Sequence, residues 1–400
     1  MSENNEVKEP LNKNNRVPKL RFPEFNENWD EIKLKEIAAR ITRKNKENKQ
    51  MLPLTISAQD GLISQYDYFD KKIASINLTT YYILKNGEFA YNKSYSNGYP
   101  YGAIKRLDSF EEGALSSLYI CFYVSNIDSN YLCYYFDSNK WNYEVKIISG
   151  EGARNHGLLN LTPSDFFNIR IFKPHTLEEQ CKISKFLELI YAKEKIINRK
   201  IDILKKYKKG VFLDTRKCSK KIALKTILSE VNIKTKYNNQ YEILSSTAIG
   251  LFSQKEYFKH QVASGNNVGY KVIKKGQLLF SPQNLWLGNI NLNNDFEIGM
   301  VSPSYKIYDI DNSINSSWLI SMLKSQNMLY KYKQISEQGA SVVRRNLDLS
   351  QFLEITLDIP NNQIQIGITL ETIDKKINAL SNLLMNLKNL KMHLLNEMFI

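Results

Sequence analysis

The sequence predicts an α+β protein built as an internal repeat: two similar compact domains and two long antiparallel coiled-coil helices that separate them, related by a pseudo-two-fold repeat. Segments of like pattern recur in the same order at a nearly constant separation of 186 to 190 residues. Each copy alternates short β-rich runs with turn signals, and a long heptad-patterned stretch follows each copy. The separation far exceeds the roughly 20–50 residues of solenoid repeats, so it indicates duplication of a whole domain.

The repeat is most visible in two passages that each lead into a proline. ISGEGARNHGLLNLTPSDFF, residues 148–167, corresponds to ISEQGASVVRRNLDLSQFL, residues 335–353, and the prolines are Pro174 and Pro360. The other recurring pairs are EIKLKEIA with KIALKTIL, YILKNGEFAYNK with KVIKKGQLLFSP, GALSSLYICF with GMVSPSYKIY, and YLCYYFDSNKW with WLISMLKSQNM. Chance apolar patterning is the alternative, but it does not explain a conserved order.

Each copy is expected to hold several short strands, a helix of about ten residues and a closing strand before the proline. The Asn86-Gly87 and Lys275-Gly276 pairs are typical of tight turns that precede a strand. The expected strands are residues 82–84, 88–91 and 118–124 in the first copy and 271–273, 278–280 and 305–310 in the second, the helices 130–140 and 316–325, and the closing strands 168–172 and 354–359.

Both stretches after the prolines have apolar residues at alternating steps of four and three, which is coiled-coil spacing. The first seam is Ile183, Leu187, Ile190, Ile197, Ile201, Leu204 and Val211, with Glu194 and Lys208 at two of its positions. The second seam is Ile366, Leu370, Ile373, Ile377, Leu380, Leu384, Leu387, Leu394 and Met398, with Lys391 at one position. Two unmatched seams predict that the helices pack on each other, as a rigid antiparallel spacer about 50 Å long. The alternative is that each helix packs on its own domain.

The composition fits a globular protein that binds a polyanion. The 400 residues are 42% hydrophobic, and the net charge of +14 favours nucleic acid as the partner, although a lysine-rich solvated surface would give the same number. The four cysteines and four histidines form no close-spaced ligand set, so we expect no metal site and a reducing cytoplasm. Residues 1–17 are polar and no long apolar run occurs, which predicts neither a signal peptide nor a membrane span.

Motifs that carry catalysis are missing from the sequence. It has no phosphate-binding GxxxxGK[ST] loop, no GxSxG or HExxH motif and no Pro-Pro pair of the adenine methyltransferase type. GEGARNHG lacks the strand-then-helix context of a dinucleotide site. We therefore expect a non-catalytic protein. Two alternatives stay open: a nuclease with a cryptic carboxylate site, and a coiled-coil adaptor that binds no DNA.

Three passages carry a family resemblance: VPKLRFPEFNENWDEIKLKEI at 17–37, SGEGARNHGLLNLTPSDFFNIRIFKP, and TLEEQCKISKFLELIYAKEKI after Pro174. With the order domain, helix, domain, helix, the chain resembles the specificity subunit of type I restriction–modification systems from about residue 17 onward. The second copy departs from this pattern, because NQIQIGIT stands where the first has LEEQCKIS, so its acidic helix start is lost.

The resemblance implies a domain plan and a function. The plan is a disordered tail at 1–17, a first target recognition domain at 18–175, a central spacer helix at 176–215, a second target recognition domain at 216–360 and a C-terminal spacer helix at 361–400. Each domain would read one half of a bipartite asymmetric site in double-stranded DNA. The helices would dock two methyltransferase subunits in the bacterial cytoplasm. S-adenosylmethionine would belong to those subunits, and ATP and magnesium to an endonuclease and translocase subunit, so no cofactor is expected in this chain.

The candidate DNA-reading residues lie in two matching loops, 92–102 and 281–289, and in two matching basic elements, 154–156 and 344–346. They combine amides, cations, tyrosines and glycines, which suit base and phosphate contacts, although the same residues populate ordinary turns. The basic run at 40–49 is either a phosphate-contacting or a solvated stretch. The candidates are Asn92, Lys93, Ser94, Tyr95, Asn97, Tyr99, Tyr101, Arg154, Asn155, His156, Ser281, Gln283, Asn284, Trp286, Asn289, Arg344, Arg345 and Asn346.

Overall fold

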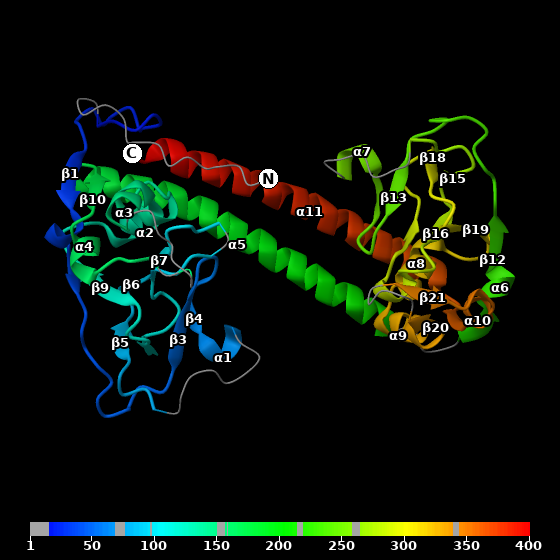
Figure 1. The fold of residues 1–400 in the computed structure, drawn as a ribbon, viewed down its shortest axis with the longest axis horizontal. Coiled ribbons are helices and arrows are strands. Elements are labelled where there is room, and N and C mark those ends of the chain that lie inside the picture. Colours follow the sequence, from blue (N-terminus) through cyan, green and yellow to red (C-terminus); the bar gives the residue numbers. More distant parts are fainter. Residues whose placement is uncertain are drawn as a thin grey trace. The chain divides into compact units, whose positions relative to one another are not determined.

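The structure, a computed structural model, describes residues 16–68, 77–96, 98–149, 157, 159–213, 219–257, 265–338 and 344–400. The chain divides into two compact units, residues 1–197 with 383–400 and residues 198–382. The two long helices are α5 (Leu177–Leu213) and α11 (Gln363–Met398), drawn in green and red in Figure 1. Each unit therefore includes a segment of each long helix.

The first unit contains two four-stranded sheets and one separate strand pair. The strands are β1 (Asp30–Lys33), β2 (Ala38–Arg40), β3 (Pro53–Ser57), β4 (Gly61–Ser64), β5 (Tyr82–Lys85), β6 (Phe89–Asn92), β7 (Ala103–Arg106), β8 (Glu112–Leu115), β9 (Ile120–Val124) and β10 (Arg170–Lys173). The sheet orders are β2-β9-β6-β7, β4-β3-β8-β5 and β1-β10. The short helices are η1 (Leu34–Glu36), α1 (Gln65–Tyr68), α2 (Ser129–Asp137), α3 (Asn142–Ser149) and α4 (Pro163–Phe167).

The second unit repeats this plan in part, with one four-stranded sheet and four strand pairs among its described residues. Its strands are β11 (Ser219–Ala223), β12 (Leu228–Val231), β13 (Leu244–Ser246), β14 (Leu251–Ser253), β15 (Lys271–Lys274), β16 (Leu278–Phe280), β17 (Ile290–Leu292), β18 (Ile298–Val301), β19 (Lys306–Ile310), β20 (Ser336–Gln338), β21 (Arg345–Leu347) and β22 (Thr356–Pro360). Its helices are α6 (Leu224–Ile227), α7 (Gln254–Tyr257), η3 (Leu285–Leu287), α8 (Ser316–Leu323), α9 (Gln326–Gln334) and α10 (Leu349–Glu354).

The internal repeat predicted from the sequence is confirmed by the sheet topology. The antiparallel order β2-β9-β6-β7 in the first unit matches β12-β19-β16-β17 in the second, and the pair β1-β10 matches β11-β22. The predicted strands agree with the observed ones to within about two residues. Both turn glycines have a positive φ, +81° at Gly87 and +85° at Gly276, which explains why glycine recurs there.

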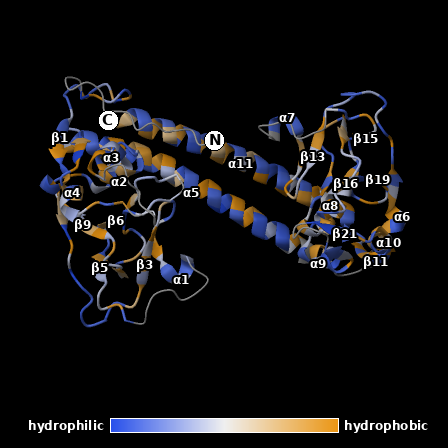
Figure 2. Ribbon diagram, viewed as in Figure 1, coloured by the Kyte–Doolittle hydropathy of each residue, from blue (hydrophilic) through white to orange (hydrophobic). Residues whose placement is uncertain are grey.

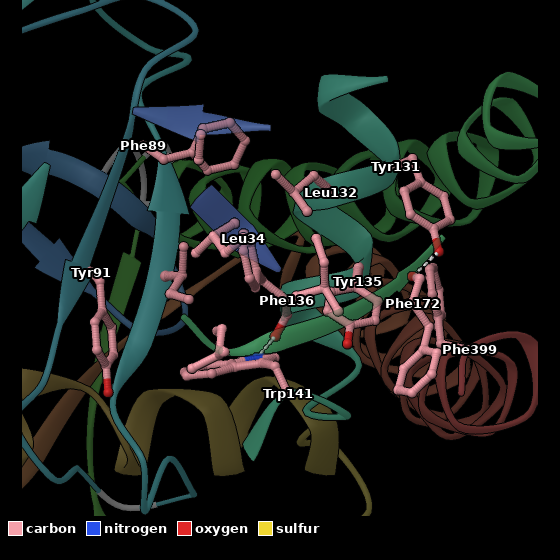
Figure 3. Packing of buried hydrophobic residues seen from close by; sticks show 14 of the residues in the cluster. Leu34, Phe89, Tyr91, Tyr131, Leu132, Tyr135, Phe136, Trp141, Phe172 and Phe399 are labelled. Carbon is pink, nitrogen blue, oxygen red and sulfur yellow. Dashed lines mark hydrogen bonds between the residues drawn. The ribbon is translucent and has the colours of Figure 1, made fainter. Parts of the chain in front are cut away.

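The core of the first unit is aromatic and includes the C-terminal residues of the chain (Figure 3). Tyr131 donates a hydrogen bond to the Phe172 carbonyl oxygen over 2.9 Å. The Trp141 indole donates to the Phe136 carbonyl oxygen over 2.8 Å at the end of α2. Phe399, just after α11, is 2% exposed and packs among these rings. The heptad pattern predicts a spacer helix at 361–400 and gives no sign of this core role.

In the second unit the core gathers around Phe280, Tyr308, Trp318 and Phe352, all fully buried. Phe280 and Tyr308 stack with ring centroids 5.8 Å apart, as Phe89 and Phe122 do in the first unit at 5.3 Å. Each unit therefore has an aromatic stack between the two matching strands, in register at Phe89 and Phe122 in the first unit and diagonal at Phe280 and Tyr308 in the second.

Within the first unit, α5 and α11 run antiparallel and share an apolar seam. Ile183 and Leu187 at the start of α5 belong to the same buried cluster as Leu394 and Met398 near the end of α11. Farther along α5, Glu194 accepts a hydrogen bond from the Lys391 amine over 2.6 Å. Figure 2 shows the alternating hydropathy along both helices.

The second unit holds an equivalent antiparallel segment. Val211 packs against the cluster that contains Ile366 and Leu370, and the Lys208 amine contacts the Asp374 carboxylate at 2.6 Å. All predicted seam positions are buried or half-buried. The three polar residues that interrupt the predicted seams, Glu194, Lys208 and Lys391, each have an opposite charge as partner. The paired-helix prediction is thus confirmed within each unit.

One glutamine near the start of each long helix binds the preceding domain. Because these two glutamines make equivalent contacts, they correct the alignment of the two junctions that the sequence suggested. Gln180 accepts a hydrogen bond from the Asp128 backbone N–H over 2.9 Å, and Gln363 accepts one from the Asn315 N–H over 2.7 Å. Asp128 and Asn315 are the N-caps of α2 and α8. The second junction therefore lacks the acidic residues but keeps the glutamine, which lies three residues after Pro360 in the second unit and six residues after Pro174 in the first.

Candidate nucleic-acid interface

The first candidate loop connects β6 to β7, and backbone hydrogen bonds hold several of its described residues. The Tyr95 N–H donates to the Gly157 carbonyl oxygen over 2.6 Å, and the Gly102 N–H donates to the Tyr99 carbonyl oxygen over 3.2 Å. Gly102 has a φ of +80°, and a Cβ there would overlap the Asn92 carbonyl oxygen. This close approach requires glycine and brings the two ends of the loop together.

Several predicted side chains of this loop bind within the chain. The Lys93 amine donates to the Leu161 carbonyl oxygen over 3.1 Å, and the Asn92 side chain accepts from the Ser94 N–H over 3.0 Å. Tyr99 and Tyr101 are half-buried and pack against the cores of the first unit. Lys93 and Tyr101 are thus better explained as structural residues than as base readers.

Tyr95 is the candidate of this loop that the structure presents to solvent, with 56% of its surface exposed. A tyrosine supplies both a flat ring and a hydroxyl donor to a nucleic acid. Four further candidates, Asn97, Arg154, Asn155 and His156, lie outside the described residues.

Two predicted readers in the second loop, Ser281 and Asn289, have buried side chains. Ser281 and Asn289 are 7% and 6% exposed. The Asn289 amide oxygen accepts from the Ser246 hydroxyl over 2.6 Å, and its amide nitrogen donates to the Ser246 carbonyl oxygen over 2.9 Å. Because both ends of this amide are occupied, Asn289 holds the loop against β13 and has no free edge for a base.

The rest of this loop stands closer to the surface. Gln283 is exposed, whereas Asn284 and Trp286 are half-buried. The Asn284 amide oxygen is buried, with no hydrogen-bond partner among the described residues. The Gln283 carbonyl oxygen accepts from the Arg345 N–H over 3.1 Å, so the loop and β21 form one surface.

The sequence predicts both Arg344 and Arg345 as base readers, and the structure shows the contacts of Arg345. The Arg345 guanidinium donates to the Ser336 hydroxyl over 2.8 Å and to the Ser336 carbonyl oxygen over 2.5 Å, and it lies 5.9 Å from the Trp286 ring centroid. It therefore clamps β20 and β21 together. Arg344 and Asn346, on the alternate face, are exposed.

The basic run at 40–49 is partly structural. The Arg43 guanidinium donates to the Glu88 carboxylate over 2.5 Å and to the Ile83 carbonyl oxygen over 3.2 Å. Lys44 lies 5.6 Å from the Tyr82 ring centroid. These two cations hold the run against β5, whereas Arg40, Lys46 and Lys49 are exposed.

Sequence reasoning missed a polar contact that follows each candidate loop. In the first unit, the Lys105 amine donates to the Asp137 carboxylate over 2.7 Å. In the second unit, the Lys324 amine donates to the Asn291 amide oxygen over 2.6 Å. In the repeat, Lys105 corresponds to Asn291 and Asp137 corresponds to Lys324. All four are polar residues at matched positions, and a comparison of such positions between the two copies would have identified the contacts from the sequence.

Lys324 predicts a pH dependence of stability in the second unit. Burial lowers the pKa of Lys324 from 10.5 to about 8, with Lys208 adding to this shift and Asp374 opposing it. Between about pH 8 and 10.5 the unfolded chain holds a proton that the folded chain has released, so stability rises with pH in this window. Wild type is expected to gain stability relative to Lys324→Gln between about pH 7 and 10, measured by urea unfolding. Equal pH profiles for the two proteins would contradict this.

Among the residues that the structure describes, no group of three or more His, Cys, Asp or Glu side chains is placed to hold a metal ion. Within the same described ranges, no helix has the length and apolar character needed to cross a bilayer.

Comparison with known proteins identifies the fold of this chain through solved structures. No protein-family profile matches the sequence, and no curated protein matches it. Among solved structures, the chain is similar to the type I restriction-modification system S subunit from M. genitalium, at 15% identity with a TM-score of 0.60, over 96% of this chain and 99% of that chain. The fold is that of a type I S subunit.

Two other solved structures show a weaker likeness. One, described as the structural basis of complex assembly and conformational transition of the type I R-M system, is 12% identical with a TM-score of 0.48 and covers 93% of this chain and 97% of that chain. The other is the HsdS subunit from Thermoanaerobacter tengcongensis, 14% identical with a TM-score of 0.40, covering 93% of this chain and 96% of that chain.

Proposed function

We propose that this chain is the DNA-reading specificity subunit of a type I restriction–modification complex, in which each unit reads one half of a bipartite asymmetric site. The observation that carries the proposal is a repeated fold whose matching loops differ in their exposed side chains. Two copies of one fold with unlike loops suit two unlike half-sites, whereas identical copies would suit a palindrome. The net charge of +14 and the S-subunit fold support a DNA partner.

The exposed candidate residues determine which contacts each unit can make with DNA bases and phosphates. Tyr95 in the first unit can donate to a phosphate or stack on a base. In the second unit, Gln283 can form paired hydrogen bonds with adenine, and Arg344 can do the same with guanine. Asn346, exposed beside them, offers a further amide. The internally bonded cations Lys93, Arg43 and Arg345 shape these surfaces.

Catalysis would belong to partner subunits. We propose that two methyltransferase subunits, which bind S-adenosylmethionine and methylate adenine, dock on α5 and α11. An ATP- and magnesium-dependent translocase and nuclease subunit would join them. The long helices carry apolar residues outside the seam: Leu189 is 69% exposed and Ile196 is 54% exposed on the α5 segment of the first unit. Exposed apolar residues seven positions apart suit a helical partner.

Arg344→Ala is expected to weaken binding at one half-site by about 1–3 kcal/mol, because a bidentate arginine–guanine contact contributes that much. Binding of the full-length chain to duplexes that carry single base changes measures this. The matched comparison is Arg345→Ala, which removes the same charge but also loosens the β20–β21 pair, so it should lower stability as well. If Arg344→Ala leaves both affinity and base preference unchanged, Arg344 does not belong to the reading surface.

The proposed function is tested by selecting duplex DNA from a randomised pool with the purified full-length chain. We expect enrichment of two unlike short motifs at a fixed spacing, with an affinity that falls steeply as salt rises. Cleavage of DNA by the chain alone with magnesium would indicate a nuclease instead. Absence of any DNA binding across a salt series would indicate an adaptor. Either outcome would overturn the proposal.

A further inference from the structure

We propose that a strand-to-helix polar contact at the same place in each unit positions the DNA-reading loop: Lys105 with Asp137 in the first unit and Asn291 with Lys324 in the second. This inference rests on the proposed function and assigns residues to it that touch no DNA. They are positioning residues, because they act through the loop that precedes them in the chain.

In the first unit, one carboxylate joins the loop to two helices. Lys105 lies in β7, three residues after Gly102 closes the candidate loop, and its amine is 2.7 Å from one Asp137 oxygen. The other Asp137 oxygen accepts from the Tyr191 hydroxyl of α5 over 2.9 Å. The return strand of the loop, the end of α2 and the long helix α5 therefore meet at Asp137. A rotation of the loop relative to α5 would break one of these contacts.

The contact is shielded from water, which makes its geometry more restrictive than that of a surface pair. The side chains of Lys105 and Asp137 are 16% and 24% exposed. Burial opposes the charge on Lys105, but the Asp137 carboxylate outweighs it and raises the lysine pKa. Loss of either partner would leave the other charge half-buried and uncompensated, so the strand would have to move to rehydrate it.

The second unit makes the same connection with different chemistry. Asn291 lies in β17, two residues after Asn289 closes the second loop. Its amide oxygen accepts from Lys324 at the end of α8, and its amide nitrogen donates to the Ser246 hydroxyl over 2.7 Å and to the Thr247 carbonyl oxygen over 2.8 Å. This amide therefore uses both of its ends to fix the return strand between α8 and β13.

The two contacts occupy equivalent positions with a different distribution of charge. Lys105 pairs in register with Ala90 of β6, and Asn291 pairs with Leu279 of β16. The strand residue is a cation in the first unit and an amide in the second, while the helix residue is an anion in the first and a cation in the second. If the strand of the first unit, with Lys105, faced the helix of the second unit, with Lys324, two cations would come together. Each loop is thus matched to the helix of its own unit.

A role in loop position differs measurably from a role in stability alone. A residue that only stabilises the unit changes how much protein is folded, but the folded molecules keep their base preference. A residue that sets the position of the loop changes which bases the folded molecules prefer at one half-site. The half-site read by the other unit is an internal control in the same molecule.

The test uses the full-length chain in the randomised-duplex selection. The variants are Asp137→Asn, which weakens the contact, Tyr191→Phe, which removes only the link to α5, and K105N/D137K, which installs the pair of the second unit. Lys85→Asn is the matched control, since Lys85 is an exposed lysine of the same unit. Thermal unfolding of each variant reports the folded fraction.

We expect Asp137→Asn and Tyr191→Phe to reduce the base preference at the first half-site by about tenfold, with the second half-site unchanged. The double variant should restore part of the preference, and Lys85→Asn should keep it whole. If Asp137→Asn fails to fold, Tyr191→Phe decides. Folded variants that keep wild-type preference at both half-sites would overturn this inference and leave the proposed function standing. A wild-type chain without half-site preference would overturn both.

Discussion

Phe399→Ala is expected to destabilise the first unit by about 3–5 kcal/mol, a large share of the stability of an ordinary domain. Phe399 is 2% exposed, and its ring centroid lies 5.4 Å from that of Tyr131 and 6.0 Å from that of Tyr135. A third ring, that of Trp29, lies 6.3 Å away. Because the surrounding aromatic side chains cannot collapse into the space of a lost ring, truncation would leave a cavity.

Amide hydrogen exchange on the full chain measures this effect in each unit separately. Protection should fall in β6 and β9 of the first unit and persist in β16 and β19 of the second. Met392→Ala is the matched control, since Met392 is 55% exposed on α11 and its loss should cost no more than about 0.5 kcal/mol. Equal loss of protection in both units, or none in either, would show that the C-terminal residues do not complete the first core.

Gly367→Ala is expected to destabilise the second unit by about 2–4 kcal/mol, although alanine normally favours a helix over glycine. A Cβ at Gly367 would overlap the side-chain amide of Asn315. That amide oxygen caps α8 by accepting from the Trp318 N–H over 3.0 Å, so it cannot turn away without loss of the cap. In the first unit Ser184 takes the place of Gly367, and its hydroxyl donates to the Asp128 carboxylate over 2.5 Å.

Gly210→Ala is the matched comparison for Gly367→Ala, because Gly210 lies in α5 and a Cβ added there would meet no other atom within 4 Å. This change should stabilise the chain by up to about 1 kcal/mol. Chemical denaturation of both variants beside wild type measures the two shifts. A stabilising effect of Gly367→Ala equal to that of Gly210→Ala would mean that the contact with Asn315 yields easily and that the junction does not depend on glycine.

The features that sequence predicted well are those with a local or periodic cause. Every seam position that the heptad spacing predicts is buried or half-buried, and even its exceptions are informative, since Glu194 and Lys391 are partners. Turn glycines such as Gly87 and Gly276 were predictable because only glycine readily adopts a positive φ. The repeat was predictable because a duplicated fold keeps the same apolar pattern.

The failures concern side-chain direction and long-range packing. Ser281 and Asn289 have the composition of a surface loop, but their burial depends on Ser246, which lies far away in the sequence. Arg344 and Arg345 are adjacent and chemically identical, yet strand alternation sends them to opposite faces. The core role of Phe399 was missed because a heptad pattern predicts a helix partner and says nothing about residues beyond the last heptad.

The most direct test of the central claim is a map of methylated adenines made by co-expressing this chain with a methyltransferase subunit and sequencing single DNA molecules. The account predicts a two-part asymmetric motif, in which Tyr95→Ala alters one part and Arg344→Ala alters the other. A single uninterrupted motif, a palindrome, or a change in both parts from either substitution would contradict it.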